Sequence, residues 1–323
     1  MNYVRSLRSI GRASGDGPVD WSTVERAAKD ATAAGRLDLD SQAIDEYRRD
    51  VKDARGAIKA ETGLEFNIPE SIEIHNRHHW IATNVSTFRR VMAPVEAHWQ
   101  SIVPDMARVI NTGTMTILLS YLAKNVLGQY DPILLADGDD AHGLYFVHPN
   151  IGRVSEELSV DRGRFRRWIA FHEVAHAAEF SAAPWLGDHL ERQLTEGIES
   201  LSRGTVDREA FREMNTTMTV VEGYAETVMD RSIDFDPTPF REKLDARRRG
   251  GGPITRVIRR FLGLEIKRRQ YERGKRFFES IVDEQGIVFA SSVWEHPDAL
   301  PSSDELENPP QWIARIEGTA ESG

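Results

Sequence analysis

The sequence predicts an α+β protein that is predominantly α-helical, with a small β element before its central helix. Apolar residues recur at helical spacing over most of the 323 residues. The run Gly143 to Val147 is short, apolar and β-prone, and Pro149 follows it. Elsewhere, proline and glycine punctuate helical tracts and do not alternate with further strands. The fold class is therefore mostly helix, with one small strand region.

The helical tracts follow one another along the chain, separated by residues that end helices. Pro94 and Pro104 divide the second tract into two or three helices, and Pro184 ends the central helix. Residues 250–253 are expected to be a joint before a basic helical pair. In chain order, the predicted helices cover residues 21–61 with a break at Gly35, 84–127, 160–181, 207–230, the basic pair ending near 284, and a short helix at Trp312.

These tracts predict four regions. Residues 1–18, rich in Gly, Ser and Arg, are expected to be a flexible N-terminal arm, and residues 317–323 a flexible tail. Between them, residues 19–127 form a helical N-terminal region, and residues 128–316 form a metal-binding region with the strand and the central helix. The two larger regions are expected to form one continuous domain, because a chain of this length can bury a single large core.

Composition excludes several kinds of function. The formal net charge of −10 argues against broad nucleic-acid binding. The chain has no cysteine, so any metal must be bound by histidine, carboxylate and water. We find no apolar stretch long enough for a signal-peptide core or a membrane span. These observations lead us to expect a cytoplasmic protein with neither a membrane nor a nucleic acid as partner.

The segment FHEVAHAAEF carries the clearest chemical signal. His172 and His176 are four residues apart, so a helix presents both imidazoles on one face, where they can bind one zinc ion. Glu173 follows the first histidine and can take a proton from a zinc-bound water. We therefore predict a Zn2+ site with Glu173 as the catalytic base. The alternative, two core histidines on a buried helix, is less favoured because the helix is amphipathic.

A third ligand is predicted in the segment VVEGYAETVMD. Glu222 and Glu226 lie one helical turn apart on this stretch. The small neighbours Gly223 and Ala225 would let this helix approach the first one closely. We therefore favour Glu222 over Glu226 as the ligand. Glu226 is then expected to hydrogen-bond the outer nitrogen of a ligand histidine.

The combination HEVAH…EGYAE resembles the gluzincins, whose third zinc ligand is a glutamate on a second helix. A narrower resemblance is to a family of zinc-dependent metalloproteases of actinobacteria and archaea, some of them described as associated with biosynthesis of a deazaflavin coenzyme. It implies a zincin-like fold with His172, His176 and Glu222 as ligands and Glu173 as base. The resemblance rests on FHEVAHAAEFSAAPWLGDHL, VVEGYAETVMD, the LGQYD and PNI segments, and FREKLDARRRGGGPITRVIRRFLGLEIKRRQY.

Two residues depart from the pattern of that family. Glu179 stands where glutamine is expected, and His148 stands where another residue type is commoner. Both are candidates for lining the cleft, together with Tyr224 and Tyr271. Neither Glu179 nor His148 changes the predicted ligand set.

The predicted function is a zinc-dependent hydrolase and, more specifically, a metallopeptidase acting on a peptide or a small amide. The alternative is a zinc-binding protein that is not a peptidase. It would be a structural or peptide-binding protein, or an amide hydrolase in a coenzyme pathway. Closure of the metal by a fourth protein ligand, Glu179 or Glu226, would favour a structural site, because catalytic zinc keeps an open position.

Two clusters of charged or polar residues remain. Residues 241–276 contain 14 Lys or Arg against four Asp or Glu, a local balance of +10. We expect a solvated helical face that pairs with acidic residues of the same chain; the alternative is a docking surface. The histidines His75, His78 and His79 lie in a polar connector and lack the ordered spacing of a second metal site.

Overall fold

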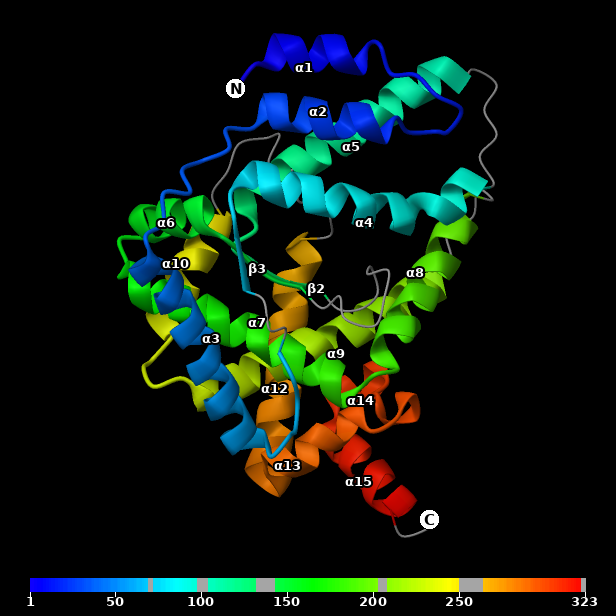
Figure 1. Ribbon diagram of the computed structural model, residues 1–323. Helices are drawn as coiled ribbons and strands as arrows, with labels where there is room; N and C mark the ends of the chain where they lie inside the picture. The colour runs from blue at the N-terminus through cyan, green and yellow to red at the C-terminus, as the bar shows by residue number, and fades with distance from the viewer. Residues whose placement is uncertain (69–71, 98–103, 132–142, 203–207, 250–263, 321–323) are drawn as a thin grey trace.

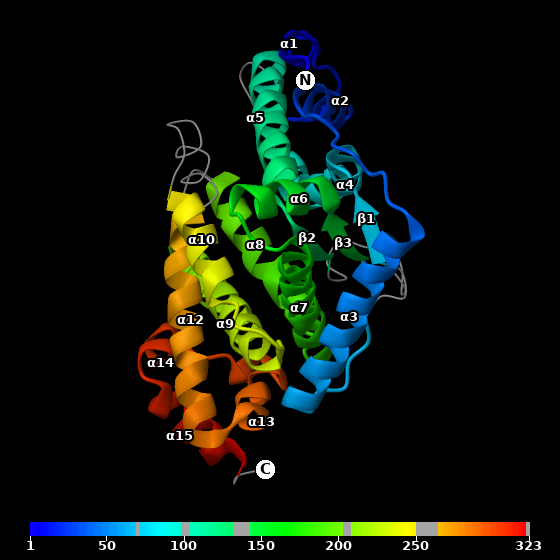
Figure 2. The ribbon, with the colours of Figure 1, turned by 90° about the vertical axis from the view of Figure 1, so that its left-hand side faces the viewer.

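Helix α7 (Arg162–Ala182) runs through the middle of the computed structural model (Figures 1 and 2). The structure describes residues 1–68, 72–97, 104–131, 143–202, 208–249 and 264–320. The other helices of this part are α1 (Tyr3–Ile10), α2 (Trp21–Ala31), α3 (Ser41–Thr62), α4 (Arg77–Ala97), α5 (Pro104–Asn125), α6 (His148–Glu157), α8 (Leu186–Ser202), α9 (Arg208–Ser232), α10 (Thr238–Arg249), α12 (Leu264–Gln285), α13 (Ile287–Ala290), α14 (Ser303–Glu307), α15 (Pro309–Ala320) and the short η2 (Ser291–Trp294) and η3 (Pro297–Ala299).

A three-stranded sheet lies beside α7. β1 (Ile72–His75) pairs in parallel with β3 (Gly143–Val147), and β2 (Gly128–Asp131) pairs with β3 in antiparallel fashion, so the strand order is β1-β3-β2. Ile74 and Gly128 both stand opposite the fully buried Phe146. Because β2 contacts α7, the sheet brings a strand to the helix that carries the histidine motif.

The sequence of α7 explains its central position. Asp161 caps its N-terminus by accepting a hydrogen bond from the backbone N–H of Arg164 at 2.7 Å. Beyond the first two turns almost every position is buried, as expected for a helix covered on all sides. The exposed first turns are tied to α3, because Arg166 forms ion pairs with Glu46 and Asp50 at 2.6 Å each. These pairs limit how α7 can rotate against α3.

Two clusters of buried apolar side chains hold the fold together. The larger surrounds α7 and takes in α3, α9, α12 and most of the sheet. The smaller joins α2, α4 and α5 around Trp21, Trp80 and Leu119, and reaches the sheet at Val147. Helix α3 belongs to the larger cluster, although it precedes α4 and α5 in the chain. The helical N-terminal region therefore contributes to both clusters.

The predicted fold class, mostly helical with a small β element, is confirmed. The strand at 143–147 and the helices around residues 172 and 222 lie where the sequence predicts them. Strands β1 and β2 and helices α6, α8 and α10 were not predicted. Pro94 lies within α4, contrary to the expected division, because a helix can accommodate proline at the loss of one hydrogen bond. By contrast, α5 begins at Pro104 as expected.

Residues 3–10, expected to belong to a flexible arm, instead form helix α1. Asn2 caps this helix by accepting a hydrogen bond from the backbone N–H of Arg5 at 3.0 Å. The helix packs against α2, and its Ser6 is buried there. The serines and arginines of this segment suggested a flexible arm. They fit in a helix because one face of the helix packs against α2 and the other face is exposed to solvent.

Candidate metal centre

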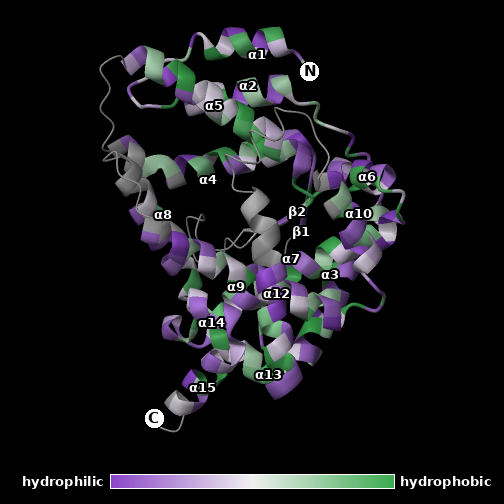
Figure 3. Cartoon of the chain, turned by 180° about the vertical axis from the view of Figure 1, so that it is seen from behind, coloured by the Kyte–Doolittle hydropathy of each residue, from purple (hydrophilic) through white to green (hydrophobic). Residues whose placement is uncertain are grey.

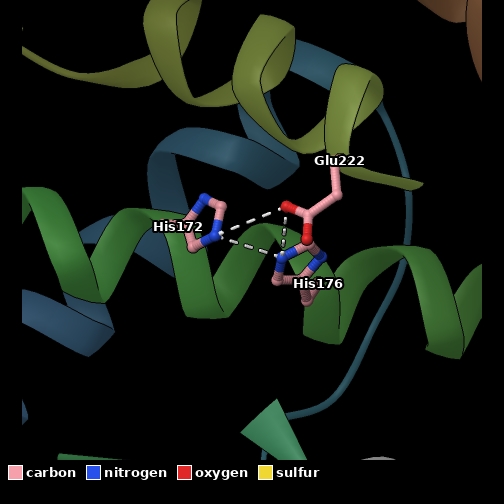
Figure 4. Close-up of side chains that lie close together, drawn as sticks. All are labelled: His172, His176 and Glu222. Carbon is pink, nitrogen blue, oxygen red and sulfur yellow. Dashed lines mark hydrogen bonds and ion pairs between the residues drawn. The ribbon is translucent and has the colours of Figure 1, made fainter. Parts of the chain in front are cut away.

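Two imidazoles and one carboxylate converge between α7 and α9 (Figure 4). His172 and His176 project from one face of α7, and Glu222 reaches them from α9. Nε2 of His172 lies 3.2 Å from Nε2 of His176. Oε2 of Glu222 lies 3.8 Å from the nitrogen of His172 and 3.7 Å from that of His176. The three atoms form a nearly equilateral triangle.

This triangle has the size that a small divalent cation requires. Ligand atoms about 2.0–2.2 Å from a tetrahedral zinc lie about 3.3–3.6 Å from one another. The edges of the triangle, 3.2–3.8 Å, are close to that range. The side chains of His172, His176 and Glu222 are 25%, 14% and 10% exposed, so the site is largely shielded from water. Both the spacing and the donor types fit zinc.

Glu179 holds the outer ring nitrogen of His176. Nδ1 of His176 donates a hydrogen bond to Oε2 of Glu179 at 2.9 Å, and Glu179 is fully buried. A proton held on Nδ1 leaves Nε2 as the ring nitrogen that can bind a metal. Burial lowers the pKa of His176, but the carboxylates of Glu179, Glu222 and Glu173 outweigh it and raise the pKa to about 9. Binding of a cation therefore displaces a proton.

Strand β2 lies against the carboxylate of Glu173. The backbone N–H of Tyr130 donates a hydrogen bond to Oε2 of Glu173 at 2.9 Å. Gly128 permits this approach, because a Cβ atom there would lie 2.7 Å from both Cγ and Oε1 of Glu173. Burial raises the pKa of Glu173 to about 7, with a further rise from Glu222 and opposing effects of His176 and the Tyr130 amide. A carboxyl group of this pKa can exchange a proton near neutral pH.

The two residues after Glu222 face away from the metal ligands. Gly223 lies against α12, since a Cβ atom on Gly223 would lie 2.5 Å from Cα of Gly274. The close approach that Gly223 allows is therefore to α12, whereas Ala225, the other small neighbour of Glu222, lies near Glu179 of α7. Tyr224 is fully buried, and its hydroxyl forms a hydrogen bond of 2.6 Å with Oγ of Ser291. The structure thus places Tyr224 in the core and not in a cleft.

Glu226 is directed toward α10. Its Oε1 accepts a hydrogen bond from Nε of Arg241 at 3.2 Å, and Arg241 also pairs with Asp230 at 2.6 Å. The hydrogen bond to a ligand histidine that was predicted for Glu226 is instead made by Glu179. The reason is geometric: Glu179 lies on α7 itself, three residues after His176, whereas the orientation of Glu226 depends on how α9 is rotated.

The comparison with known proteins decides the family. The profile of the zincin-like metallopeptidase family matches residues 19–207 and 200–313. The chain belongs to the zincin-like metallopeptidase family. A solved structure from Chloroflexus aurantiacus, described as that of a candidate hydrolase with a novel fold, is 32% identical to it. The similarity covers 93% of this chain and 99% of that one, with a TM-score of 0.75. No curated protein sequence matches this chain.

Membership of the zincin-like family implies a bound metal. In the described residues, the group of three or more side chains that could bind one is His172, His176 and Glu222. None of the helices described is both long enough and apolar enough to cross a bilayer. The family and the site thus agree on a metal centre between α7 and α9.

Two further cleft candidates, His148 and Tyr271, lie on α6 and α12. Nδ1 of His148 is 2.9 Å from the hydroxyl of Tyr47, and Arg162 donates a hydrogen bond to its Nε2 at 2.7 Å. Burial lowers the pKa of His148 to about 4, and the charges of Arg162 and Arg166 add to this effect. The side chain of Tyr271 lies outside the described residues. His148 is thus fixed by neighbours on α3 and α7.

The histidines near residue 75 belong to β1 and α4 and not to a polar connector. Nε2 of His75 lies 2.8 Å from Oε2 of Glu73, and Nε2 of His78 lies 2.7 Å from the backbone oxygen of Thr32. They take part in no metal-binding group within the described ranges. Their partners are those of structural histidines.

Four of the six basic side chains that the structure describes in the basic segment pair with acidic residues of the same chain, namely Arg241, Arg247, Arg273 and Lys275. The other two, Lys243 and Arg276, donate hydrogen bonds to backbone oxygens. Lys275 binds Asp230 at 2.7 Å, and Arg247 binds Glu157 at 2.7 Å. Residues 250–263 lie outside the described residues. These ion pairs agree with the expectation of a helical face whose positive charge is neutralised by acidic residues of the same chain.

Proposed function

We propose that this chain is a zinc-dependent hydrolase and, within that class, a metallopeptidase. The observation that carries the proposal is the triangle of His172, His176 and Glu222, with Glu173 next to the first histidine on the same helix. Three protein ligands leave one position of a tetrahedral ion for water or substrate, which is the arrangement of catalytic zinc. Membership of the zincin-like metallopeptidase family supports the same class of reaction.

The residues of the site would divide the work as follows. His172, His176 and Glu222 hold the ion, which when bound polarises a substrate carbonyl and lowers the pKa of a water molecule. Glu173 accepts a proton from the attacking water and delivers it to the leaving nitrogen. The backbone N–H of Tyr130 binds one oxygen of Glu173 and so limits the rotation of its carboxylate.

The contacts around the site support an open metal position. Glu179 binds the outer nitrogen of His176, and Glu226 binds Arg241. Neither of the two carboxylates that could close the site therefore belongs to the group of candidate ligands. An open position favours catalysis over a purely structural zinc. A protein that binds peptides without cleaving them, or a hydrolase of small amides, would give a different result in the assays below.

Metal analysis combined with a cleavage assay tests the proposal. Protein purified without added metal is expected to hold about one zinc per chain and to cleave members of a broad peptide library. Glu173→Gln should keep the zinc and lose cleavage by about a hundredfold or more, because general acid–base catalysis contributes about 10²–10⁴-fold. Equal cleavage by the variant would exclude Glu173 as the base. Zinc without cleavage would point to the non-peptidase alternatives.

Two variants on α9 separate the ligand from its neighbour. Glu222→Gln should lower zinc affinity strongly, because it removes a charged ligand. Glu226→Gln removes a carboxylate from the same helix, one turn further on, and should leave zinc bound because Glu226 pairs with Arg241. Zinc content after dialysis against a chelator distinguishes the two. The opposite pattern, loss of zinc only in Glu226→Gln, would reverse the assignment.

A further inference from the structure

Large apolar side chains are exposed together at one end of the molecule. Among the described residues, the exposed large apolar side chains lie on or beside α1 and on α5, except for Val288 on α13. Each is between 55% and 71% exposed. We call these residues the apolar end: Met1, Tyr3, Val4, Leu7, Met106, Ile110 and Ile117.

The exposed apolar side chains of α1 and of α5 form one surface, because the two helices are in contact (Figures 1 and 2). Ile10 of α1 faces Gly113 of α5, where an added Cβ atom would lie 3.5 Å from Cγ2 of Ile10. Helical spacing places Gly113 on the same face of α5 as Ile110 and Ile117. Figure 3 shows apolar residues on both helices at this end of the molecule. The exposed side chains therefore adjoin across the α1–α5 contact.

Helix α1 adds positive charge to this surface. Arg5, Arg8 and Arg12 are exposed along α1 and just beyond it, and the sequence contains no Asp or Glu before Asp16. Arg5 lies 3.4 Å from Asp30, yet 68% of its side chain remains exposed. The whole chain carries a net charge of −10, so α1 is a local basic patch on an acidic protein. The patch is complementary to a negatively charged partner.

We propose that the apolar end docks on the surface of an anionic lipid bilayer. An interfacial helix buries its apolar side among the headgroups, while its arginines bind the anionic lipids. On α5, Asp105 precedes Met106, and its charge is balanced by Arg108 at 2.8 Å. The contact is peripheral and needs no spanning helix. This proposal departs from the sequence-based expectation that the protein has no membrane partner. That expectation rested on finding no apolar stretch long enough to span a bilayer.

Exposure and charge distinguish this partner from two others. Side chains that are more than half exposed protrude and do not line a groove, whereas a peptide helix is bound in a groove. A soft bilayer surface accepts protruding side chains. A second copy of the chain fits less well, because a symmetric contact would bring the arginines of two α1 helices together.

Co-sedimentation of the full chain with lipid vesicles tests the proposal. The protein is expected to bind equimolar phosphatidylcholine and phosphatidylglycerol vesicles and to bind phosphatidylcholine vesicles much more weakly. The double variant Val4→Asp with Leu7→Asp should abolish binding. Arg8→Glu with Arg12→Glu should weaken it by about 25-fold or more, at about fivefold for each charge near the surface. Val288→Asp and Arg276→Glu, which change exposed residues outside the apolar end, are the matched controls and should bind like the wild type.

Three kinds of result would overturn the proposal. One is a failure in the vesicle assay, where the wild type binds neither kind of vesicle or the Val4→Asp with Leu7→Asp variant binds as well as the wild type. Another is a dimer in sedimentation velocity without lipid that the same variant converts to a monomer, which would assign the surface to a second copy. The third is binding to an acidic amphipathic peptide but not to vesicles. Circular dichroism melts check that each variant is folded, as expected for exposed positions.

Discussion

Nδ1 of His176 donates a hydrogen bond of 2.9 Å to Oε2 of Glu179, and both residues lie on α7. A spacing of three residues on one helix is enough to bring the two side chains together. The carboxylate is fully buried, so the bond is protected from competing water. The imidazole that would bind the metal is therefore oriented by its own helix before any ion arrives.

Removal of this carboxylate should weaken metal binding without destroying the site. Glu179→Ala is expected to lower zinc affinity about 10–100-fold, the usual cost of losing a partner of a ligand histidine. Glu179→Gln should cost less, because its amide oxygen can still accept the hydrogen bond. Titration of each variant with zinc against a chelating dye measures the difference. Glu191→Ala, an exposed change on α8, is the control, and wild-type affinity in Glu179→Ala would refute the role.

A side chain at Gly128 should disturb Glu173. In Gly128→Ala the new Cβ atom would lie 2.7 Å from Cγ of Glu173, so the carboxylate must move. A displacement of about 1 Å can cost about a hundredfold in rate, so kcat/KM should fall by that order while zinc stays bound. Steady-state kinetics on a peptide from the library assay, with zinc analysis, checks this. The control is Gly163→Ala on α7, whose new Cβ atom makes only an ordinary contact and which should keep wild-type kinetics. Wild-type activity in Gly128→Ala would show that β2 can shift to admit the methyl group without displacing Glu173.

The crossing of α9 and α12 should not tolerate a methyl group. A Cβ atom on Gly223 would lie 2.5 Å from Cα of Gly274, and one on Gly274 would lie 2.9 Å from Cα of Gly223. Gly223→Ala and Gly274→Ala should each destabilise the protein by about 3 kcal/mol or more, at the upper end of overpacking costs. Urea unfolding measures the loss. Gly56→Ala, at an exposed position of α3 with open space around it, should instead stabilise by up to about 1 kcal/mol.

His148 should make stability fall in mild acid. Its pKa is about 4 in the folded protein and about 6.5 when unfolded, so the unfolded state binds a proton first as the pH drops. Its contribution is complete above about pH 6.5 and is lost between about pH 6.5 and pH 4. Because His148 is only partly buried, water screens some of this effect, and we expect a loss of about 1–2 kcal/mol, less than the full shift would imply.

The variant His148→Gln isolates this effect. Glutamine can still accept a hydrogen bond from Arg162 and donate one to Tyr47, but it does not titrate. Unfolding free energies of the wild type and the variant, measured at about pH 7.5 and about pH 5, should therefore differ in slope, with the steeper fall in the wild type. Parallel pH profiles would exclude His148 as the source.

The central helix and the convergence of its histidines with Glu222 could be predicted because the information is local. The spacing of His172 and His176 in HEVAH specifies one helical face, whatever surrounds it. Glu222 was inferred from a second helical segment, and the structure brings it within 3.8 Å of both histidines. The short strand at 143–147 could be predicted in the same way, from a run of β-prone residues.

The supporting residues could not be predicted, since they depend on how elements are arranged in space. The choice between Glu179 and Glu226 as partner of His176 depends on the rotation of α9, which its contact with α12 helps to determine. Tyr130 acts through its backbone N–H, which every residue except proline possesses, so its side chain gives no signal. Gly128 is significant only because β2 passes so close to α7. The LGQYD segment, noted for its resemblance alone, contains both residues.

The meeting of Gly223 and Gly274 also links the metal centre to a distant part of the chain. Glu222 precedes Gly223 in the chain. The distance between α9 and α12 at Gly223 therefore also affects how far Glu222 extends toward the histidines. Helix α12 supplies none of the three candidate ligands, yet a bulkier residue at its crossing point would shift one of them. Because glycine is already the smallest residue, a change at one position cannot compensate for enlargement of the other. In related chains that retain the metal, both positions should accordingly stay glycine.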